Sequence, residues 1–327
     1  MNPAPPIPPR RTQDIHLDSG LTEGTKYFYS LFTYDAARNY SNGVFASATF
    51  IFKPFTVIAL PDTQYLTLDY PALLTTQTQW ILDNAAAKNI AFVLHEGDMT
   101  HTNIEQSWIN ASNSFAVLDG KVPYAIVPGN HDMIGGTTAL LNKYFPVSKF
   151  KDLPTFGGVF QADKMNNSYR FFSAGGTDWL VVALEYNPSD ELLDWASQIV
   201  AANPGRRVIV LTHAYLAPDD KRSGTGENIW NKLVRKYRNI SFVFNGHYTD
   251  DEAARLVSDG DNGNKIYQMF ADYQTLNFGG TGYLRIVELD RSRHKVSVKT
   301  YTPWLDTYKT DDANQFEFMD VDLSPPQ

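Results

Sequence analysis

The sequence predicts an α/β fold with a small all-β segment in front of it. From Phe55 onward, short apolar runs that suit buried strands alternate with stretches of helical periodicity. Before Phe55, apolar and polar residues alternate between polar turns, as in antiparallel strands. The chain has 327 residues, 43% hydrophobic and 13% aromatic, which is enough for one large domain and a small one.

Composition narrows the classes of function. The formal net charge of −8 disfavours long nucleic acid as a partner, because an acidic surface repels a polyanion. A small phosphorylated substrate stays compatible with this charge, since a bound metal ion reverses the field inside a cleft. The absence of cysteine excludes disulfides, thiolate zinc sites and cysteine nucleophiles. No apolar run reaches transmembrane length, so we expect no membrane span, and the sequence leaves the oligomeric state open.

Residues 1–53 divide into a proline-rich start and a β-rich part. We expect residues 1–13 to be a linker or a cloning remnant. We also expect an extracellular or periplasmic bacterial protein, whose export signal would lie upstream of this sequence. Residues 14–53 predict two strands, at 27–33 and 44–52, around a polar turn. The pattern of residues 21–41 resembles the C-terminal half of a fibronectin type III module. A whole module has about seven strands and about 100 residues, so we expect a partial module or a short packing segment.

The α/β part contains ten predicted strands and five predicted helices. The strands are expected at 56–60, 91–95, 124–127, 169–173, 179–185, 208–212, 241–245, 266–270, 283–289 and 295–301. The helices are expected at 71–88, 105–118, 138–144, 189–202 and 227–237. The first helix has Pro71 in its first turn, where the missing N–H is harmless.

Five polar clusters stand directly after predicted strands. They are Pro61-Asp62-Thr63-Gln64, Gly97-Asp98, Gly129-Asn130-His131-Asp132, Thr212-His213 and Gly246-His247. Taken singly, each suits a helix cap or a turn. Taken together they indicate one site, because ligands of open α/β sheets bind outside the carboxyl ends of the strands. Oxygen and imidazole donors without thiolate suit Mn, Mg, Fe or Zn.

In this order, the five clusters resemble the signature of the calcineurin-like metallophosphoesterases, and Gly129-Asn130-His131-Asp132 is the specific part. The resemblance implies a four-layer sandwich of two mixed β-sheets flanked by helices, with a centre for two divalent metal ions. It gives a catalytic domain at 55–305 and a C-terminal tail at 306–327. Asp98 would bridge both metals, and Asn130, His213 and His247 would complete one site.

The second metal site, with Asp62, departs from the family pattern twice. Gln64 and Thr249 stand where the family usually has histidine. Gln64 then binds a hard cation through its carbonyl oxygen, or His101, Asp250 or Asp251 replaces the lost imidazoles, or the protein holds one metal. We expect Mn²⁺, with Fe, Zn or Mg as alternatives.

The implied activity is hydrolysis of a small phosphoester by a metal-activated hydroxide that attacks phosphorus in line with the leaving group. The resemblance implies that His131 protonates the leaving group or orients the phosphate, and Asp132 would fix its imidazole or cap the next segment. Candidate pocket residues are Tyr215, Tyr248, Asp272, Tyr273 and Gln274. Arg206 and Arg207 are expected at the opposite end of the sheet. The lack of an evident basic clamp favours a phosphodiester, with some phosphomonoesterase activity.

Two readings from other classes remain open. One is a catalytically weakened metal-binding or surface-binding protein with one occupied metal site. The other is a carbohydrate-binding protein in which the β segment is the active part, which retained glycan binding after deletion of residues 1–53 would contradict.

Overall fold

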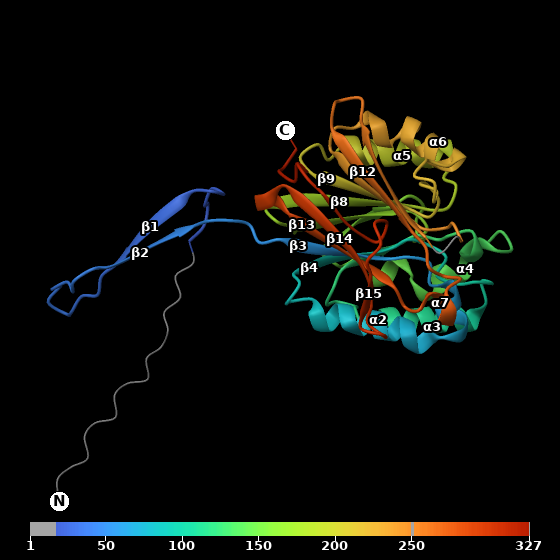
Figure 1. Cartoon of the computed structure of the whole chain (residues 1–327), viewed down its shortest axis with the longest axis horizontal. Helices are drawn as coiled ribbons and strands as arrows, with labels where there is room; N and C mark the ends of the chain where they lie inside the picture. The colour runs from blue at the N-terminus through green and yellow to red at the C-terminus, as the bar shows by residue number, and fades with distance from the viewer. Residues whose placement is uncertain (1–17, 250–251, 327) are drawn as a thin grey trace, which may run out of the picture. The chain divides into compact units, whose positions relative to one another are not determined.

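The computed structural model describes residues 18–249 and 252–326, and it divides the chain into two compact units, 1–52 and 53–327 (Figure 1). Asp250 and Asp251, two of the expected substitute ligands, lie outside the described residues. None of the helices in the described ranges is long and apolar enough to cross a bilayer.

The first unit is a β-hairpin. Strands β1 (Lys26–Leu31) and β2 (Val44–Thr49) pair antiparallel, from Lys26 opposite Thr49 to Leu31 opposite Val44. The polar turn between them is held by Asp35, whose carboxylate accepts the backbone N–H groups of Ala37 and Asn39. The second strand ends earlier than predicted, at Thr49.

The second unit contains two large mixed sheets. One has the order β11-β12-β10-β9-β8-β7-β6, and the other has the order β15-β14-β13-β3-β4-β5, with β16 paired to β14. The first sheet is built from β6 (Phe156–Val159), β7 (Ser168–Ala174), β8 (Thr177–Leu184), β9 (Arg207–Thr212), β10 (Ile240–Asn245), β11 (Ala253–Asp259) and β12 (Lys265–Ala271). The second is built from β3 (Phe55–Leu60), β4 (Ile90–His95), β5 (Tyr124–Ile126), β13 (Leu284–Asp290), β14 (Lys295–Thr302), β15 (Thr307–Lys309) and β16 (Gln315–Phe318).

Helices cover the outer faces of both sheets, which confirms the predicted four-layer arrangement (Figure 1). The helices are α1 (Gln64–Asp69), α2 (Pro71–Asn84), α3 (Glu105–Phe115), α4 (Ala139–Tyr144), α5 (Asp190–Ala201), α6 (Gly224–Lys232) and α7 (Asn277–Gly280). Local chemistry sets their starts: Ser189 caps α5 by accepting the N–H of Leu192, and acidic residues follow in the first turn.

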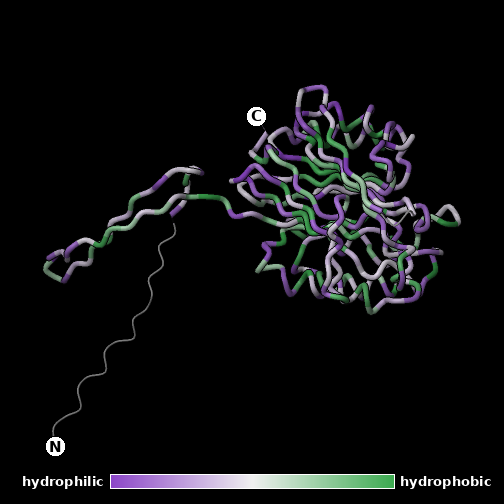
Figure 2. Tube along the Cα trace, viewed as in Figure 1, coloured by the Kyte–Doolittle hydropathy of each residue, from purple (hydrophilic) through white to green (hydrophobic). Residues whose placement is uncertain are grey.

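Three apolar layers hold the second unit together. The central one lies between the sheets and includes Val57, Phe92, Trp179 and Phe244. The outer two lie between one sheet and α2 and α3, and between the other sheet and α5 and α6. The strands in the middle of both sheets are therefore buried on both faces and appear as apolar stretches of the chain (Figure 2).

The parallel strands decide where the functional site lies. Strands β3, β4 and β5 run parallel in one sheet, and β8, β9, β10 and β12 run parallel in the other. The carboxyl ends of each set meet at one edge of its sheet, and the polar segments that follow β3, β4, β5, β9 and β10 all leave from those ends.

The C-terminal segment departs from the expectation of a tail at 306–327. Strands β15 and β16 extend the second sheet, and Val321 and Leu323 are buried in the layer between the sheets. Sequence alone did not predict these strands because they are short and depend on pairing with β14. The compact unit thus continues past residue 305 through the described C-terminal residues.

Candidate metal centre and active site

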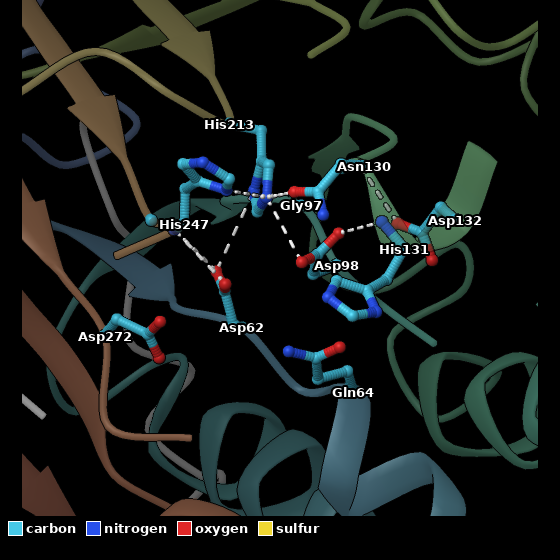
Figure 3. Close-up of polar contacts among 12 residues, drawn as sticks. Asp62, Gln64, Gly97, Asp98, Asn130, His131, Asp132, His213, His247 and Asp272 are labelled. Carbon is cyan, nitrogen blue, oxygen red and sulfur yellow. Dashed lines mark hydrogen bonds and ion pairs between the residues drawn. The ribbon is translucent and has the colours of Figure 1, made fainter. Parts of the chain in front are cut away.

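Three metal-ligating side chains from both sheets meet at one point. Asp98, His213 and His247 each offer one ligand atom, and these atoms lie within 4.8 Å of one another (Figure 3). His213 Nε2 is 3.2 Å from Asp98 Oδ2, 3.1 Å from His247 Nδ1 and 3.1 Å from Asn130 Oδ1. Asp98 and His213 are fully buried. Four residues that are far apart in the sequence therefore form one cluster.

The arrangement of these four atoms suits a cation. His213 Nδ1 donates its hydrogen to the carbonyl oxygen of Glu96 at 2.9 Å, so the lone pair of Nε2 points into the cluster. The carboxylate oxygen of Asp98 and the amide oxygen of Asn130 also bring lone pairs. Such atoms repel one another unless a proton or a cation lies between them. Donors bound at about 2.1 Å stand roughly 3 Å apart, which is the spacing found here.

The backbone around Asp98 is specialised for this position. Gly97 and Asp98 both have positive φ angles, +100° and +46°, and His247 has φ of +87°. Such angles are rare for residues other than glycine and persist where the surrounding structure holds them. Asp98 Oδ1 accepts the backbone N–H of His131 at 2.8 Å, which ties the segment after β4 to the segment after β5.

Asp98 and His213 shift each other's charge state. Although burial alone would raise it, the pKa of Asp98 is lowered, because the His213 imidazole lies beside the carboxylate. Burial would lower the pKa of His213, but the neighbouring Asp98 raises it. For His247, burial and then the nearby His213 lower the pKa to about 4. A neutral His247 is the form that binds metal.

Asp62 lies on the other side of the cluster, among further carboxylates. Its oxygens accept the backbone N–H of His247 at 3.2 and 3.3 Å, and Gln274 Nε2 donates to it at 3.4 Å and to Asp272 at 2.7 Å. Burial, then the charges of Asp272, Asp98 and Glu96, raises the pKa of Asp62 well above its ordinary value. A divalent cation would relieve this repulsion.

His131 is held with one ring nitrogen free. Its Nδ1 lies 2.6 Å from the carbonyl oxygen of His101, so this nitrogen carries a hydrogen. Its ring stacks on the ring of His101, with centroids 4.9 Å apart. The hydrogen bond from its backbone N–H to Asp98 places His131 beside the cluster of Asp98, His213 and His247 (Figure 3). Its Nε2 remains available for a substrate.

Comparison with known proteins shows the family to which this chain belongs. Residues 55–249 match the model of the calcineurin-like phosphoesterase family. The chain belongs to this family. It is 34% identical over 284 residues to the uncharacterized protein YvnB of Bacillus subtilis; the match covers 83% of this chain and 22% of that protein. The chain thus spans about a fifth of the length of this curated relative.

Solved structures share the fold of this chain. The purple acid phosphatase PPD1 of yellow lupin seeds is similar with a TM-score of 0.55 and 14% identity, covering 93% of this chain and 61% of that one. A dimetal phosphatase of Danio rerio has a TM-score of 0.55 and 12% identity, covering 82% of this chain and 100% of that one. At these identities the likeness supports the fold.

The surroundings of Asp62 include the two positions that depart from the family pattern, Gln64 and Thr249. Gln64 is buried, and its Oε1 accepts a hydrogen bond from His101 Nδ1 at 3.0 Å. His101 stacks between Tyr65 and His131, at centroid distances of 4.5 and 4.9 Å. Its Nε2 then carries a lone pair. Thr249 is exposed. His101 and Gln64 are therefore paired beside the site.

Asp132 connects the segment that follows β4 to the segment that follows β5. Its carboxylate accepts the backbone N–H groups of Met99, Thr100 and Gly129 and the hydroxyl of Thr100, at 2.8 to 3.0 Å. Burial, then the charge of Asp98, raises the pKa of Asp132 to about 7, and the donated hydrogen bonds oppose this rise. The ring of His131 is fixed by His101 and not by Asp132. Asp132 is thus a positioning residue.

The candidate pocket tyrosines have different positions. Tyr248 lies against His247, with ring centroids 4.8 Å apart. Tyr215 is buried in the layer under α5 and α6 and donates its hydroxyl to Gln268, so the structure does not bring it to the site. Tyr273 is also buried, and its hydroxyl contacts Thr300 and Asn314. Arg207 begins β9 and donates to Ser241, at the opposite end of the sheet from His213.

Three residues at the site were missed in the sequence. Tyr186 follows β8, and its ring lies 5.8 Å from that of His213 and 5.1 Å from that of His247. Glu96 is buried, and its Oε2 has no hydrogen-bond partner. Burial raises the pKa of Glu96 well above its usual value, and the charge of Arg285, which is fully buried, opposes this rise. Tyr186 and Glu96 had a signal, because both follow predicted strands directly.

Proposed function

We propose that this chain is a metal-dependent phosphoester hydrolase with a preference for phosphodiesters. The observation that carries the proposal is the convergence of Asp98, His213 and His247, with the amide oxygen of Asn130 at 3.1 Å from His213 Nε2. Membership of the calcineurin-like phosphoesterase family supports this chemistry for the cluster.

Two divalent cations would occupy the centre. One would be held by Asn130, His213 and His247 and shared through Asp98, and the other by Asp62, Gln64 and Asp98. Oxygen donors dominate the second set, which favours a hard cation, and we propose Mn²⁺. When bound, the two ions would make a water molecule more nucleophilic near neutral pH and neutralise charge on the phosphoryl oxygens.

The chain's own residues orient the substrate and move a proton. In its imidazolium form, His131 would donate the Nε2 proton to the leaving oxygen and keep the Nδ1 hydrogen on the carbonyl oxygen of His101. Asp132 would keep the segments that carry Asp98 and His131 in register through its four hydrogen bonds.

The surroundings of the cluster support the preference for a diester. Among the described residues, the side chains in contact with Asp98, His213 and His247 are carboxylate, amide and aromatic groups, with no lysine or arginine. A phosphodiester carries one negative charge and a phosphomonoester up to two, so the diester needs less neutralisation.

The test is hydrolysis of bis(p-nitrophenyl) phosphate and p-nitrophenyl phosphate by protein loaded with Mn²⁺. We expect faster turnover of the diester, and loss of both activities together with bound metal in Asp98→Ala. Metal analysis of the same samples gives the number of ions per chain. Wild-type protein that binds metal but hydrolyses neither ester with Mn²⁺, Mg²⁺, Fe or Zn²⁺ would instead favour a non-catalytic metal-binding protein.

We also propose that the hairpin unit is part of a fibronectin type III module. Phe28, Leu31 and Phe45 are 78%, 67% and 72% exposed, although side chains of this kind form the core of a β-sandwich. Exposed apolar side chains on both strands of an isolated hairpin support a partial module.

A further inference from the structure

A cavity lies away from the proposed metal centre, at the amino end of β5. Its lining comes from the segment 119–124, which leads into β5, from residues 149–155, which precede β6, and from Arg170 on β7. The metal ligands follow the carboxyl ends of the strands, so this cavity lies at the other end of β5. Its volume is about 230 Å³. Pockets for drug-sized ligands have roughly 300–1,000 Å³, so this one suits a smaller molecule.

The cavity contains a buried cation without a partner. Arg170 is 1% exposed, and none of its three guanidinium nitrogens has a hydrogen-bond acceptor within residues 18–249 and 252–326. The guanidinium carbon lies 4.5 Å from the ring centre of Phe150 and 4.8 Å from that of Phe156. Aromatic rings cover a guanidinium without accepting its N–H groups, so five donors remain unsatisfied. Burial lowers the pKa of Arg170 to about 10, which leaves it charged at neutral pH.

The other fully buried arginine shows what a structural role looks like in this chain. Arg285 donates to the carbonyl oxygens of Phe270 and Ala313 at 3.1 and 2.7 Å, and the charge of Glu96 acts on it. Its surroundings supply acceptors for two of its three guanidinium nitrogens, Nη1 and Nη2, as a buried cation requires. Arg170 has none of these, although it lies in an equally buried place. Among the described residues, Arg170 therefore lacks the acceptor that a bound anion would supply.

The one carboxylate that lines the cavity already has partners within the protein. Asp119 accepts a hydrogen bond from Tyr124 at 2.8 Å and pairs with Lys149 at 2.9 Å. This carboxylate is thus engaged by other groups. The lining holds three cations, Lys121, Lys149 and Arg170, against the single carboxylate of Asp119. An anion is the ligand that this balance of charge attracts.

We propose that this cavity binds a small organic carboxylate with an apolar body. The edge of a guanidinium matches a carboxylate through two parallel hydrogen bonds, and Arg170 is among the residues that line the cavity. Val122, Pro123, Phe150, Leu153 and Pro154 provide an apolar lining for the rest of the ligand. Benzoate has this combination of charge, shape and size.

The test uses benzoate and its neutral analogue benzamide on the full, metal-loaded chain. Calorimetric titration and thermal melting are expected to show binding of benzoate and not of benzamide. Arg170→Met should weaken benzoate binding by roughly tenfold or more, as loss of a charged hydrogen bond does. The matched control is Arg206→Met, which removes an arginine stacked over Phe171 at 4.5 Å but 31% exposed. It should leave benzoate binding unchanged.

Two further measurements keep the proposal falsifiable. Benzoate binding should persist in Asp98→Ala, which separates this cavity from the metal centre and from the proposed hydrolase activity. A crystal soaked in 4-bromobenzoate should place the bromine anomalous signal against the apolar lining at Leu153 and Pro154, with the carboxylate toward Arg170, whether or not Arg170→Met folds. Equal binding of benzoate and benzamide, or a bromine signal only at the metal centre, would overturn the proposal, as would loss of binding in Asp98→Ala.

Discussion

The backbone of Gly246 approaches the carboxylate of Asp62 so closely that a β-carbon at position 246 would lie 2.1 Å from Asp62 Oδ1. Gly129 has the same relationship to the neighbouring ligand, because its β-carbon would lie 2.0 Å from Asp98 Oδ1. Neither glycine has a positive φ angle. Glycine is therefore needed at both positions for steric reasons and not for its backbone conformation. A side chain there would collide with the carboxylates of the proposed metal centre.

Alanine at either position should disturb metal binding. In Gly246→Ala and Gly129→Ala, the added methyl group has to displace Asp62 or Asp98 by more than an ångström. We expect metal affinity to fall about 10- to 100-fold, as it does when groups that orient metal ligands are changed. Metal content after dialysis and hydrolysis of bis(p-nitrophenyl) phosphate measure the effect. Gly205→Ala is the control, since nothing lies within 4 Å of a β-carbon there; equal losses in the control would show that the effect is not steric.

His131→Ala should separate substrates by their leaving groups. His131 Nδ1 is held by the carbonyl oxygen of His101, so Nε2 is the nitrogen that can donate to a leaving oxygen. Nitrophenolate leaves without protonation, whereas an alkoxide needs the proton. We expect activity on nitrophenyl esters to change little and activity on alkyl esters to fall by about 10²- to 10⁴-fold. Steady-state kinetics on one ester of each kind are the measurement, and equal losses on both would refute this role.

Gln64→His should strengthen the second metal site. The Gln64 amide oxygen is shared with His101 Nδ1 at 3.0 Å, which leaves it a weak ligand. An imidazole at this position would bind a divalent cation more tightly and shift the preference from Mn²⁺ toward Zn²⁺. Titration of metal-free protein with each ion, followed by metal analysis, should show a second ion bound more tightly than in the wild type. An unchanged second affinity would mean that position 64 is not a ligand.

A companion variant, His101→Ala, distinguishes the two roles that remain for His101. Loss of the second ion would identify His101 as a ligand through its Nε2. Retention of the ion with a modest drop in affinity would show that His101 orients Gln64. The stacking partner Tyr65 offers a matched control, since Tyr65→Phe keeps the ring that packs on His101 and removes only a hydroxyl.

The sequence alone predicts the position of a central strand such as β9 closely. The apolar run of β9, Arg207–Thr212, is buried throughout, and its predicted limits differ from the observed ones by one residue. Strands buried on both faces must be apolar along their whole length, so their signal is local. Strand β6, Phe156–Val159, contains two glycines and pairs only with β7, and β16 pairs only with β14. Edge strands of this kind depend on their partners and leave little local signal.

The sequence predicts which residues come together at the site, because this depends on the order and direction of the strands. Side chains after parallel strands share an edge, and this places Asp98, His213 and His247 together. The direction in which a neighbouring side chain points is not set by that rule. Tyr215 and Tyr186 both follow parallel strands, yet Tyr215 turns into the core to reach Gln268, and Tyr186 lies against His247. Buried charges such as Glu96 and Arg285 also acquire their meaning only from the folded surroundings.

His95 gives a prediction for stability against pH. It lies at the end of β4, fully buried; Gly97 N–H donates to its Nδ1 at 3.3 Å, so its Nε2 donates to Thr63 at 2.9 Å. Burial, then the charge of His213, lowers the pKa of His95 from 6.5 to about 3. The folded protein therefore needs this imidazole neutral, whereas the unfolded chain protonates it below pH 6.5.

The sign of the effect follows from this difference. Between pH 6.5 and about 3 the unfolded chain binds one more proton at His95, so the free energy of unfolding falls as the pH falls. The slope from one such group is at most about 1.4 kcal/mol per pH unit. His95→Gln keeps a donor and an acceptor but cannot titrate, so its stability should decline less steeply in this window. Urea unfolding at a series of pH values, in EDTA to exclude metal binding, measures both slopes. Parallel slopes for the two proteins would mean that His95 is protonated in the folded state as easily as in the unfolded chain, and that its burial does not contribute to acid sensitivity.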